Sequence, residues 1–224
     1  MKHAIITLVL VLILAITEVN FAQNTYILQP GEKNNQVVLE LSNISTTEAA
    51  TDIEVKLIRK SKNLKFISEE KILNNLAQTT QSEIPFSFDV EYNIGETNAD
   101  TIEFLITDRA YRQTGNKGIS LTKQFVLEYS VPTEYRLEQN YPNPFNPVTK
   151  IRYSVPQNTG SKMQNIELII YDILGNKVTT LVNEQKKTGY YEVEFNASQF
   201  ASGVYIYRLQ ANDFIATKKM LLIK

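Results

Sequence analysis

The sequence contains no cysteine and no tryptophan, and its one histidine is His3. The missing cysteine excludes disulfides, thiolate metal sites, cysteine nucleophiles and an acylated lipoprotein cysteine. Because His3 lies in a segment that we expect to be removed, the mature chain would also lack histidine triads, histidine metal sites and c-type haem attachment. We therefore predict that the protein is not an enzyme, and we assign no catalytic, cofactor-binding or metal-binding residues.

A strong charge of either sign is missing as well. The 224 residues include 23 basic and 24 acidic side chains, so no global field would steer the protein to nucleic acid. Apolar residues make up 43% of the chain, which is too many for a disordered protein and enough for packed cores. The length fits one large domain or two small ones.

The N-terminus has the pattern of a signal peptide. Lys2 precedes an apolar run over residues 4–16, in which only Thr7 is not apolar. We predict a signal peptide over residues 1–22 that is cleaved between Ala22 and Gln23. The alternative is a membrane anchor, but a span needs about 20 apolar residues and this run is shorter. We expect no integral membrane span in the mature chain.

Apolar and polar residues alternate in short runs through the rest of the sequence, which is typical of half-buried strands. The runs centre on Leu39, Val55, Phe86, Phe104, Leu127, Tyr153, Leu168, Val193 and Tyr207, and two further runs cover residues 178–182 and 214–223. Residues 64–76 fit either a strand pair or a helical turn. The pattern predicts an all-β protein with two immunoglobulin-like β-sandwich domains in tandem.

The boundary between these domains is expected near Pro132, because proline cannot donate a hydrogen bond to a central strand. Residues 23–130 carry 11 basic and 15 acidic side chains, net −4, whereas residues 131–224 carry 11 and 8, net +3. We predict a first sandwich over 23–130, a linker over 131–136 and a second sandwich over 137–224.

A proline-rich segment opens the second sandwich. Tyr141-Pro142-Asn143-Pro144-Phe145-Asn146-Pro147 has three prolines in six residues, which fix φ repeatedly and remove three hydrogen-bond donors. The residues before the prolines are pushed to extended conformations. We expect a rigid segment outside the sheet, with Tyr141 and Phe145 plugging one end of a core.

The second half resembles the type A C-terminal sorting domain of the type IX secretion system over residues 137–224. The resemblance rests on several blocks that occur in the family's order and end with the last residues of the sequence. The residues assigned to the sorting motif are Tyr141, Pro142, Asn143, Pro144, Phe145, Asn146, Pro147, Tyr171, Asp172, Gly175, Val178, Gly189, Tyr190, Gly203, Val204, Tyr205, Lys218, Lys219, Met220, Leu221, Leu222, Ile223 and Lys224. The blocks are also similar to an immunoglobulin-like domain of flagellar hook-capping proteins, but the signal peptide favours sorting.

The resemblance implies a route and partners. Proteins of this family leave the cytoplasm by the general secretory path of a diderm bacterium, and an outer-membrane translocon then reads the folded domain in the periplasm. A sortase-like peptidase commonly removes that domain and can attach the cargo to anionic lipopolysaccharide. The implied product is secreted or on the cell surface, and nucleic acid is not an expected partner. Where the family often has a hairpin glycine, this chain has Asn212-Asp213, which tolerate the same left-handed φ.

Two classes of function remain for residues 23–130: a structural or binding module, which we favour, and a small hydrolase that uses two carboxylates. The carboxylates available to a hydrolase are Glu54, Glu83, Asp89, Glu91, Glu103 and Asp108. On alternating strands such side chains usually form a solvated face. Asp100 and Asp108 could contribute to a calcium site, although their spacing is not that of an EF-hand. The basic cluster at residues 59–65 is expected to be a solvated loop, offset by Glu69 and Glu70.

The last apolar run, Met220 to Ile223, would fray at a chain end unless it pairs in a sheet. We predict that it forms a terminal strand and buries three or four aliphatic side chains.

Overall fold

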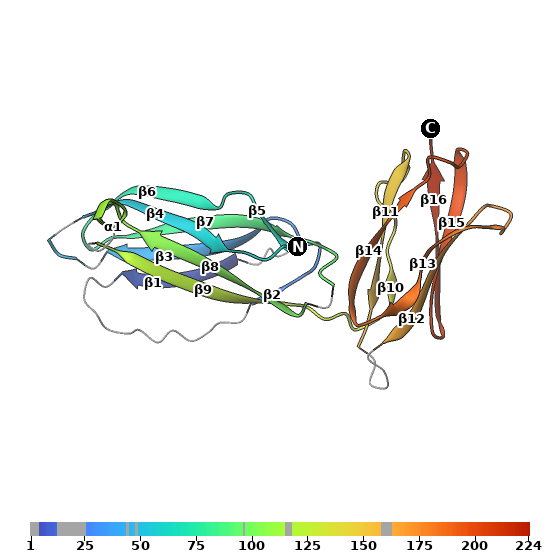
Figure 1. Ribbon diagram of the computed structural model, residues 1–224, viewed down its shortest axis with the longest axis horizontal. Helices are drawn as coiled ribbons and strands as arrows, with labels where there is room; N and C mark the ends of the chain where they lie inside the picture. Colours follow the sequence, from blue (N-terminus) through green and yellow to red (C-terminus); the bar gives the residue numbers. More distant parts are fainter. Residues whose placement is uncertain are drawn as a thin grey trace. The chain divides into compact units, whose positions relative to one another are not determined.

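The computed structural model describes residues 5–12, 26–43, 45–47, 49–95, 97–114, 118–157 and 163–224. Strands dominate these residues, and the one helix among them, α1 (Arg109–Thr114), has six residues. The prediction of an all-β fold is therefore confirmed. The chain divides into two compact units, which run from blue to green and from yellow to red in Figure 1. The first comprises residues 1–91 and 98–130, and the second comprises residues 92–97 and 131–224.

The first unit contains two sheets. One has the order β1-β3-β7-β5 and the other has the order β2-β9-β8-β4-β6. Their strands are β1 (Ile5–Leu12), β2 (Tyr26–Leu28), β3 (Asn35–Asn43), β4 (Ala50–Arg59), β5 (Leu64–Phe66), β6 (Glu70–Leu76), β7 (Gln81–Val90), β8 (Ala99–Thr107) and β9 (Ser120–Tyr129). The stretch that fitted two interpretations thus forms two strands, β5 and β6, one in each sheet.

Aromatic side chains from both sheets meet in the core of the first unit. The rings of Phe86 on β7 and Phe104 on β8 lie 4.7 Å apart between centroids, and both residues are fully buried. Phe104 also meets Phe125 of β9 edge to face at 6.0 Å. Strand alternation points these rings inward, so the two sheets pack face to face as a sandwich.

Part of the predicted signal peptide is described. Residues Ile5 to Leu12 form β1 and pair in parallel with β3, from Gln36 to Asn43. The predicted cleavage site between Ala22 and Gln23 lies outside the described residues. No helix in the described part of the chain is long and apolar enough to cross a membrane.

The second unit also contains two sheets, with the orders β10-β11-β14 and β13-β12-β15-β16. We call the four-stranded sheet sheet D. The strands are β10 (Arg136–Leu137), β11 (Val148–Val155), β12 (Gln164–Tyr171), β13 (Lys177–Lys186), β14 (Gly189–Asn196), β15 (Gly203–Ala211) and β16 (Phe214–Leu222). Asn212 adopts a φ of 52° in the turn between β15 and β16, as expected for an asparagine in place of glycine.

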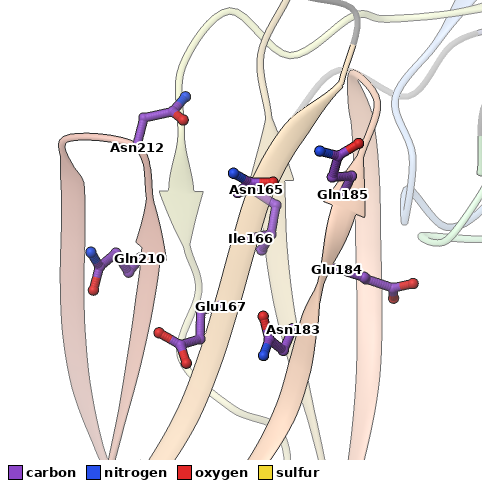
Figure 2. Close-up of a pocket in the computed structure, with 8 residues that line it drawn as sticks. All are labelled: Asn165, Ile166, Glu167, Asn183, Glu184, Gln185, Gln210 and Asn212. Atoms are coloured by element: carbon purple, nitrogen blue, oxygen red, sulfur yellow. The ribbon is translucent and has the colours of Figure 1, made fainter.

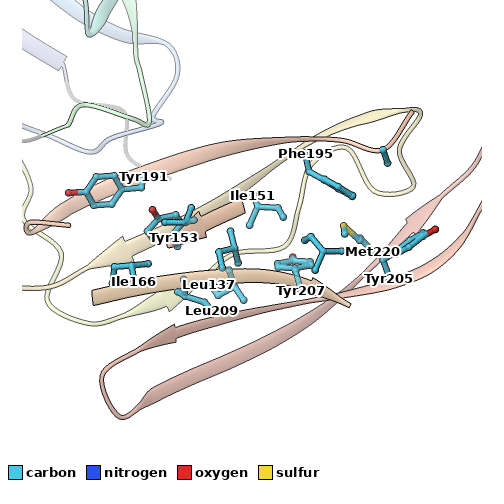
Figure 3. Packing of buried hydrophobic residues seen from close by; sticks show 14 of the residues in the cluster. Leu137, Ile151, Tyr153, Ile166, Tyr191, Phe195, Tyr205, Tyr207, Leu209 and Met220 are labelled. Atoms are coloured by element: carbon cyan, nitrogen blue, oxygen red, sulfur yellow. The ribbon is translucent and has the colours of Figure 1, made fainter. Parts of the chain in front are cut away.

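Figure 3 shows the core of the second unit, where side chains from the two sheets meet. Tyr153 of β11 and Tyr207 of β15 are among the largest fully buried side chains. The terminal strand is only partly as predicted. Met220 and Leu222 are 1% exposed, whereas Leu221 and Ile223 are 36% and 48% exposed, because alternate residues of a strand face opposite sides.

Candidate functional site

Strand register brings most of the sorting-motif blocks to one end of the second unit. Tyr171 pairs with Ile206, and Gly203 pairs with Leu222, so the end of β12, the start of β15 and the end of β16 lie together. Phe145 forms an isolated bridge with Leu222, which places the proline-rich loop there too. We call this region the motif end; it comprises residues 141–147, 172–176, 203–205 and 220–224.

Gly189 and Tyr190 do not join the motif end. They pair with Val155 and Ser154, at the far end of β11 from its first residue, Val148. The sequence resemblance groups them with the other motif residues, but the fold separates them by the length of a strand.

The proline-rich loop holds one of its two aromatic side chains inside and the other outside. Phe145 is 2% exposed, and its ring lies 6.0 Å from that of Phe195. Tyr141 is 80% exposed, so the prediction that it plugs the core was wrong. Its backbone N–H and C=O both pair with Lys150 at 3.0 Å, and this bridge turns the side chain outward. The Tyr141–Pro142 and Asn143–Pro144 peptide bonds are cis.

The same loop fixes the end of β16. The N–H of Phe145 donates to the carbonyl of Leu221, and its carbonyl accepts from the N–H of Ile223, both at 3.0 Å. The Asn143 side-chain oxygen accepts a further hydrogen bond from the N–H of Leu221 at 2.9 Å. These bonds occupy backbone groups that would otherwise fray at the strand end. The loop and the terminal strand therefore form one structural element.

A buried hydrogen-bond network lies beneath the loop. The Tyr207 hydroxyl accepts from the N–H of Asn140 at 2.8 Å and donates to the carbonyl of Glu138 at 2.9 Å. Burial raises the pKa of Tyr207 to about 12, although the Asn140 N–H opposes the shift. The Asn140 amide donates to the Pro142 carbonyl at 2.9 Å and to the Thr149 hydroxyl at 3.0 Å. The network ties the loop to both sheets.

The turn between β12 and β13 is organised by Asp172. One carboxylate oxygen accepts from the N–H groups of Leu174 and Asn176, and the other accepts from the Asn176 side-chain amide, all at 2.9 Å. The hydrogen bonds from Asn176 lower the pKa of Asp172, so the carboxylate stays ionised. Gly175 has a φ of 85°, which a glycine adopts without strain. Ile173 and Leu174 point away from this scaffold and are 71% and 83% exposed.

The remaining motif residues have structural contacts. The Arg208 guanidinium lies 5.0 Å from the ring centre of Tyr171, and the Tyr205 hydroxyl donates to the carbonyl of Ala201 at 2.7 Å. The Lys224 ammonium donates to the carbonyl of Ser198 at 2.7 Å. Val178 packs against the core, Lys218 is half-buried, and Lys219 is exposed.

A shallow polar groove crosses the outer face of sheet D at the other end from the Asp172 turn (Figure 2). Its lining is rich in side-chain amides, and strand register sets Asn165 opposite Gln185 and Glu167 opposite both Asn183 and Gln210. Amides both donate and accept hydrogen bonds, so this surface suits hydroxyl-rich or peptide ligands. The sequence showed no motif for it, because the side chains come from three strands and from the turn after β15.

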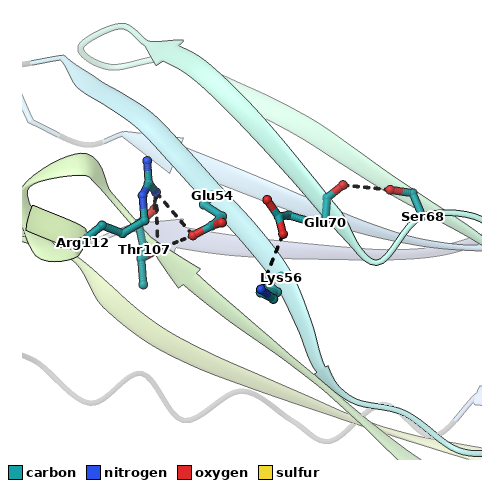
Figure 4. Close-up of polar contacts among 6 residues, drawn as sticks. All are labelled: Glu54, Lys56, Ser68, Glu70, Thr107 and Arg112. Atoms are coloured by element: carbon teal, nitrogen blue, oxygen red, sulfur yellow. Dashed lines mark hydrogen bonds and ion pairs between the residues drawn. The ribbon is translucent and has the colours of Figure 1, made fainter.

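In the first unit, several candidate carboxylates already have ionic partners. Figure 4 shows Glu54 beside Arg112, with 3.7 Å between carboxylate oxygen and guanidinium nitrogen, and within 3.4 Å of the Thr107 hydroxyl. Nearby, Lys56 pairs with Glu70 at 3.6 Å. The first pair joins the middle of β4 to α1, and the second joins the middle of β4 to the start of β6.

The remaining acidic candidates are dispersed. Asp89 pairs with Lys33 at 3.1 Å. Asp100 and Asp108 lie at opposite ends of β8, roughly 25 Å apart at about 3.3 Å per residue, so they cannot share a calcium ion. Within the described ranges, no group of three or more histidine, cysteine, aspartate or glutamate side chains could hold a metal ion. Strand register places one pair of glutamates side by side: Glu83 of β7 is directly opposite Glu40 of β3.

The basic cluster at residues 59–65 is tied to neighbouring acidic residues. Lys60 forms an ion pair with Glu69, and Lys65 forms one with Glu91. Asn63 is buried, and its amide donates to the Asp100 carboxylate at 3.0 Å. The loop expected here is therefore shorter than residues 59–65, because Arg59 ends β4 and Leu64 begins β5.

One comparison with known proteins finds a family match within the second unit. A family model described as a secretion system C-terminal sorting domain matches residues 139–224. No curated protein matches the chain. Among solved structures, latent PorU from Porphyromonas gingivalis is similar to 92% of this chain, at 14% identity and a TM-score of 0.33. The chain spans 19% of the length of that PorU chain.

Two further solved structures are similar over most of the chain. The YadV chaperone is 11% identical, with 90% of this chain and 98% of that chain covered and a TM-score of 0.31. The calcium-binding domain CBD12 of CALX1.1 is 5% identical, with 83% and 77% covered and a TM-score of 0.33. The family match agrees with the sequence resemblance, because residues 139–224 match the model of the secretion system C-terminal sorting domain.

Proposed function

We propose that this protein is exported through the type IX secretion system and that residues 137–224 are the signal that the outer-membrane translocon reads. One observation carries the proposal: the family match over residues 139–224 covers a folded unit whose motif blocks meet at one end. A receptor can contact residues that are far apart in the sequence when the fold presents them on one surface.

The proposed route begins with the signal peptide. Residues 1–22 direct the chain to the general secretory path and are removed near Ala22, which leaves β3 as an edge strand held by its antiparallel pairing with β7. The chain folds in the periplasm and is then delivered to the cell surface or the medium of a diderm bacterium. A sortase-like peptidase acting on the sorting domain would leave the first unit as the final product, with attachment to lipopolysaccharide as one fate.

For the first unit we propose a non-enzymatic role as a structural or binding module. The mature chain lacks histidine and cysteine, and the ion pairs of Glu54 and Asp89 account for two of the candidate carboxylates. The Glu40–Glu83 pair is the arrangement that a carboxylate hydrolase would most resemble. A screen of the mature chain against polysaccharides, esters and peptides should show no turnover. Turnover that Glu40→Gln or Glu83→Gln abolishes would overturn this part of the proposal.

The export role is tested with a fluorescent reporter that carries a signal peptide and residues 137–224, in a host with the type IX pathway. The full domain should take the reporter to the surface or the medium. A matched fusion that lacks residues 219–224 should leave it in the periplasm, because β16 loses its buried end. Periplasmic retention of both fusions would contradict the proposal. Equal export of both would mean that the terminal strand is not needed for export.

A further inference from the structure

We propose that Ile173 and Leu174, at the tip of the Asp172 turn, are an anchor that inserts into an aliphatic pocket with an acidic rim on a protein of the outer-membrane secretion machinery. This inference rests on the proposed export function and names the surface that the receptor contacts.

The anchor is part of a larger apolar surface. Ile173 and Leu174 are 71% and 83% exposed, and neither side chain contributes to the core. Val204 and Leu221 lie directly opposite each other on the outer face of β15 and β16, at the same end of sheet D, and are 39% and 36% exposed. Four aliphatic side chains at one end of a sheet, from three separate segments, are more than the single exposed residues common on protein surfaces.

The hydrogen bonds that stabilise the turn do not involve the side chains of Ile173 and Leu174. Besides the three hydrogen bonds to the Asp172 carboxylate, the Asp172 N–H donates to the Asn176 carbonyl at 3.0 Å and the Gly175 N–H donates to the Asp172 carbonyl at 3.1 Å. A tip that is rigid before binding loses little conformational entropy when it docks. This rigidity fits a preformed pocket, and a few such central residues usually carry most of the binding energy of an interface.

The surroundings of the anchor are basic. The three segments that build this end of sheet D, residues 171–182, 203–209 and 216–224, contain five basic residues and one acidic residue, Asp172. The Asp172 carboxylate accepts hydrogen bonds within its own turn. Lys177, Arg208 and Lys219 form no ion pair within the described part of the chain. A receptor with acidic groups around its pocket would complement this rim and gain in association rate and specificity.

A protein receptor fits these features better than a lipid surface. Stable membrane attachment needs a wide apolar face or an acyl chain. The anchor has two aliphatic side chains on a fixed turn, which is the geometry of a knob entering a shaped pocket. The basic rim alone would bind anionic lipid only weakly and in a salt-dependent way.

The test uses the full chain in a type IX host. The variant is Ile173→Ser with Leu174→Ser, and the matched control is Ile67→Ser with Ile215→Ser, which removes two aliphatic side chains that are 74% and 59% exposed away from the motif end. The anchor variant should keep the thermal unfolding midpoint of the parent, because the turn does not use these side chains. Its exported fraction should fall about tenfold or more, and that of the control should not change. A second variant, Lys177→Glu with Lys219→Glu, should also reduce export while the fold persists.

A photo-crosslinking residue at position 174 identifies the occupant. We expect an adduct with a component of the outer-membrane secretion machinery, and none from the same residue at position 215. Normal export of the anchor variant would overturn the inference while the proposed function stands, whereas retention of the parent chain would overturn the proposed function itself. Crosslinks from position 174 only to lipid, or only to a second copy of the chain, would also overturn the inference.

Discussion

The two units are both built from packed β-sheets, yet they differ in the side chains that they expose at the ends of their sheets. Surface ion pairs occur in both, such as Glu54 with Arg112 in the first unit and Arg152 with Glu192 in the second. In the second unit, the motif end uses hydrogen bonds to fix a loop and a turn, and leaves Ile173 and Leu174 exposed. A shared architecture therefore does not assign a function. The function of each unit depends on the residues that it exposes at its ends.

The outer face of sheet D exposes different side chains at its two ends. Near the start of β12 it is lined by amides, including Asn165 and Gln185, whereas near the end of β12 it carries the aliphatic residues of the motif end. One sheet therefore offers a hydrogen-bonding surface and an apolar surface, separated by the length of its strands.

The largest expected effect comes from deleting residues 219–224, which should unfold the second unit and leave the first intact. The deletion removes Met220 and Leu222, each fully buried and contributing about 1.5–3 kcal/mol. It also removes the backbone bonds to Phe145 and opens a sheet edge, out of a total stability of about 5–15 kcal/mol for a small domain. Calorimetry should show the loss of one thermal transition. Deleting Lys224 alone is the control, and two preserved transitions after the longer deletion would refute the prediction.

Tyr207→Phe should destabilise the second unit by about 1–3 kcal/mol, because the buried N–H of Asn140 and carbonyl of Glu138 lose their partner. Tyr141→Phe is the matched control, since that ring is 80% exposed, and it should change the free energy of unfolding by less than about 0.5 kcal/mol. Denaturant titrations followed by circular dichroism measure both. Equal effects of the two substitutions would mean that the buried network does not hold the loop.

Glu192→Gln should reduce the pH dependence of the second unit's stability. Burial opposes ionisation of Glu192, but Lys150 and Arg152, at 2.6 Å and 2.8 Å from its carboxylate oxygens, outweigh burial and lower its pKa. A lowered folded-state pKa gives stability that is complete above the unfolded-state value and is lost as pH falls through the folded-state value. The substitution should cost up to about 1 kcal/mol at neutral pH, because the pair is partly exposed, and little under strong acid.

The control for this experiment is Glu194→Gln, an exposed carboxylate on the same strand. Urea unfolding between neutral and acidic pH should distinguish the two variants. An equal loss for Glu192→Gln at every pH would show that the effect comes from packing rather than from the ionised carboxylate.

The smallest effect is expected in the first unit. Glu83→Gln removes like-charge repulsion from Glu40, which lies directly across the strand pair, and should stabilise this unit by about 0.2–1 kcal/mol. Raising the salt concentration should shrink the gain, because exposed charges are screened. A loss of stability would mean that the two carboxylates share a favourable contact. That result would support the alternative that the first unit is a carboxylate hydrolase.

Local rules of sequence predicted the strands well, because period-2 alternation is strong in both units. The same rules were incomplete at Met220 to Ile223, where a continuous apolar run hid the alternation that exposes Leu221 and Ile223. Residues 64–76 could not be assigned, since their apolar spacing fits both a helix turn and a strand pair. The short helix α1 follows β8 without any strong periodic pattern.

The residues of the candidate site could be predicted from the sequence motifs, but their arrangement on one surface could not. Which blocks meet depends on strand register, so the sequence could not separate Gly189 and Tyr190 from the motif end. The network around Asn140 joins residues 67 positions apart, and no local pattern reports such a contact. Tyr141 was misassigned because its backbone bridge to Lys150, rather than its apolar character, sets its direction.

The proposed function assigns the export signal to the second unit and not to the first. The most direct measurement compares two reporters in the same type IX host, one joined to residues 23–130 and the other to residues 137–224, both behind the same signal peptide. Only the second reporter should reach the cell surface or the medium, while the first stays in the periplasm. Export of the first reporter, or retention of the second, would contradict this assignment.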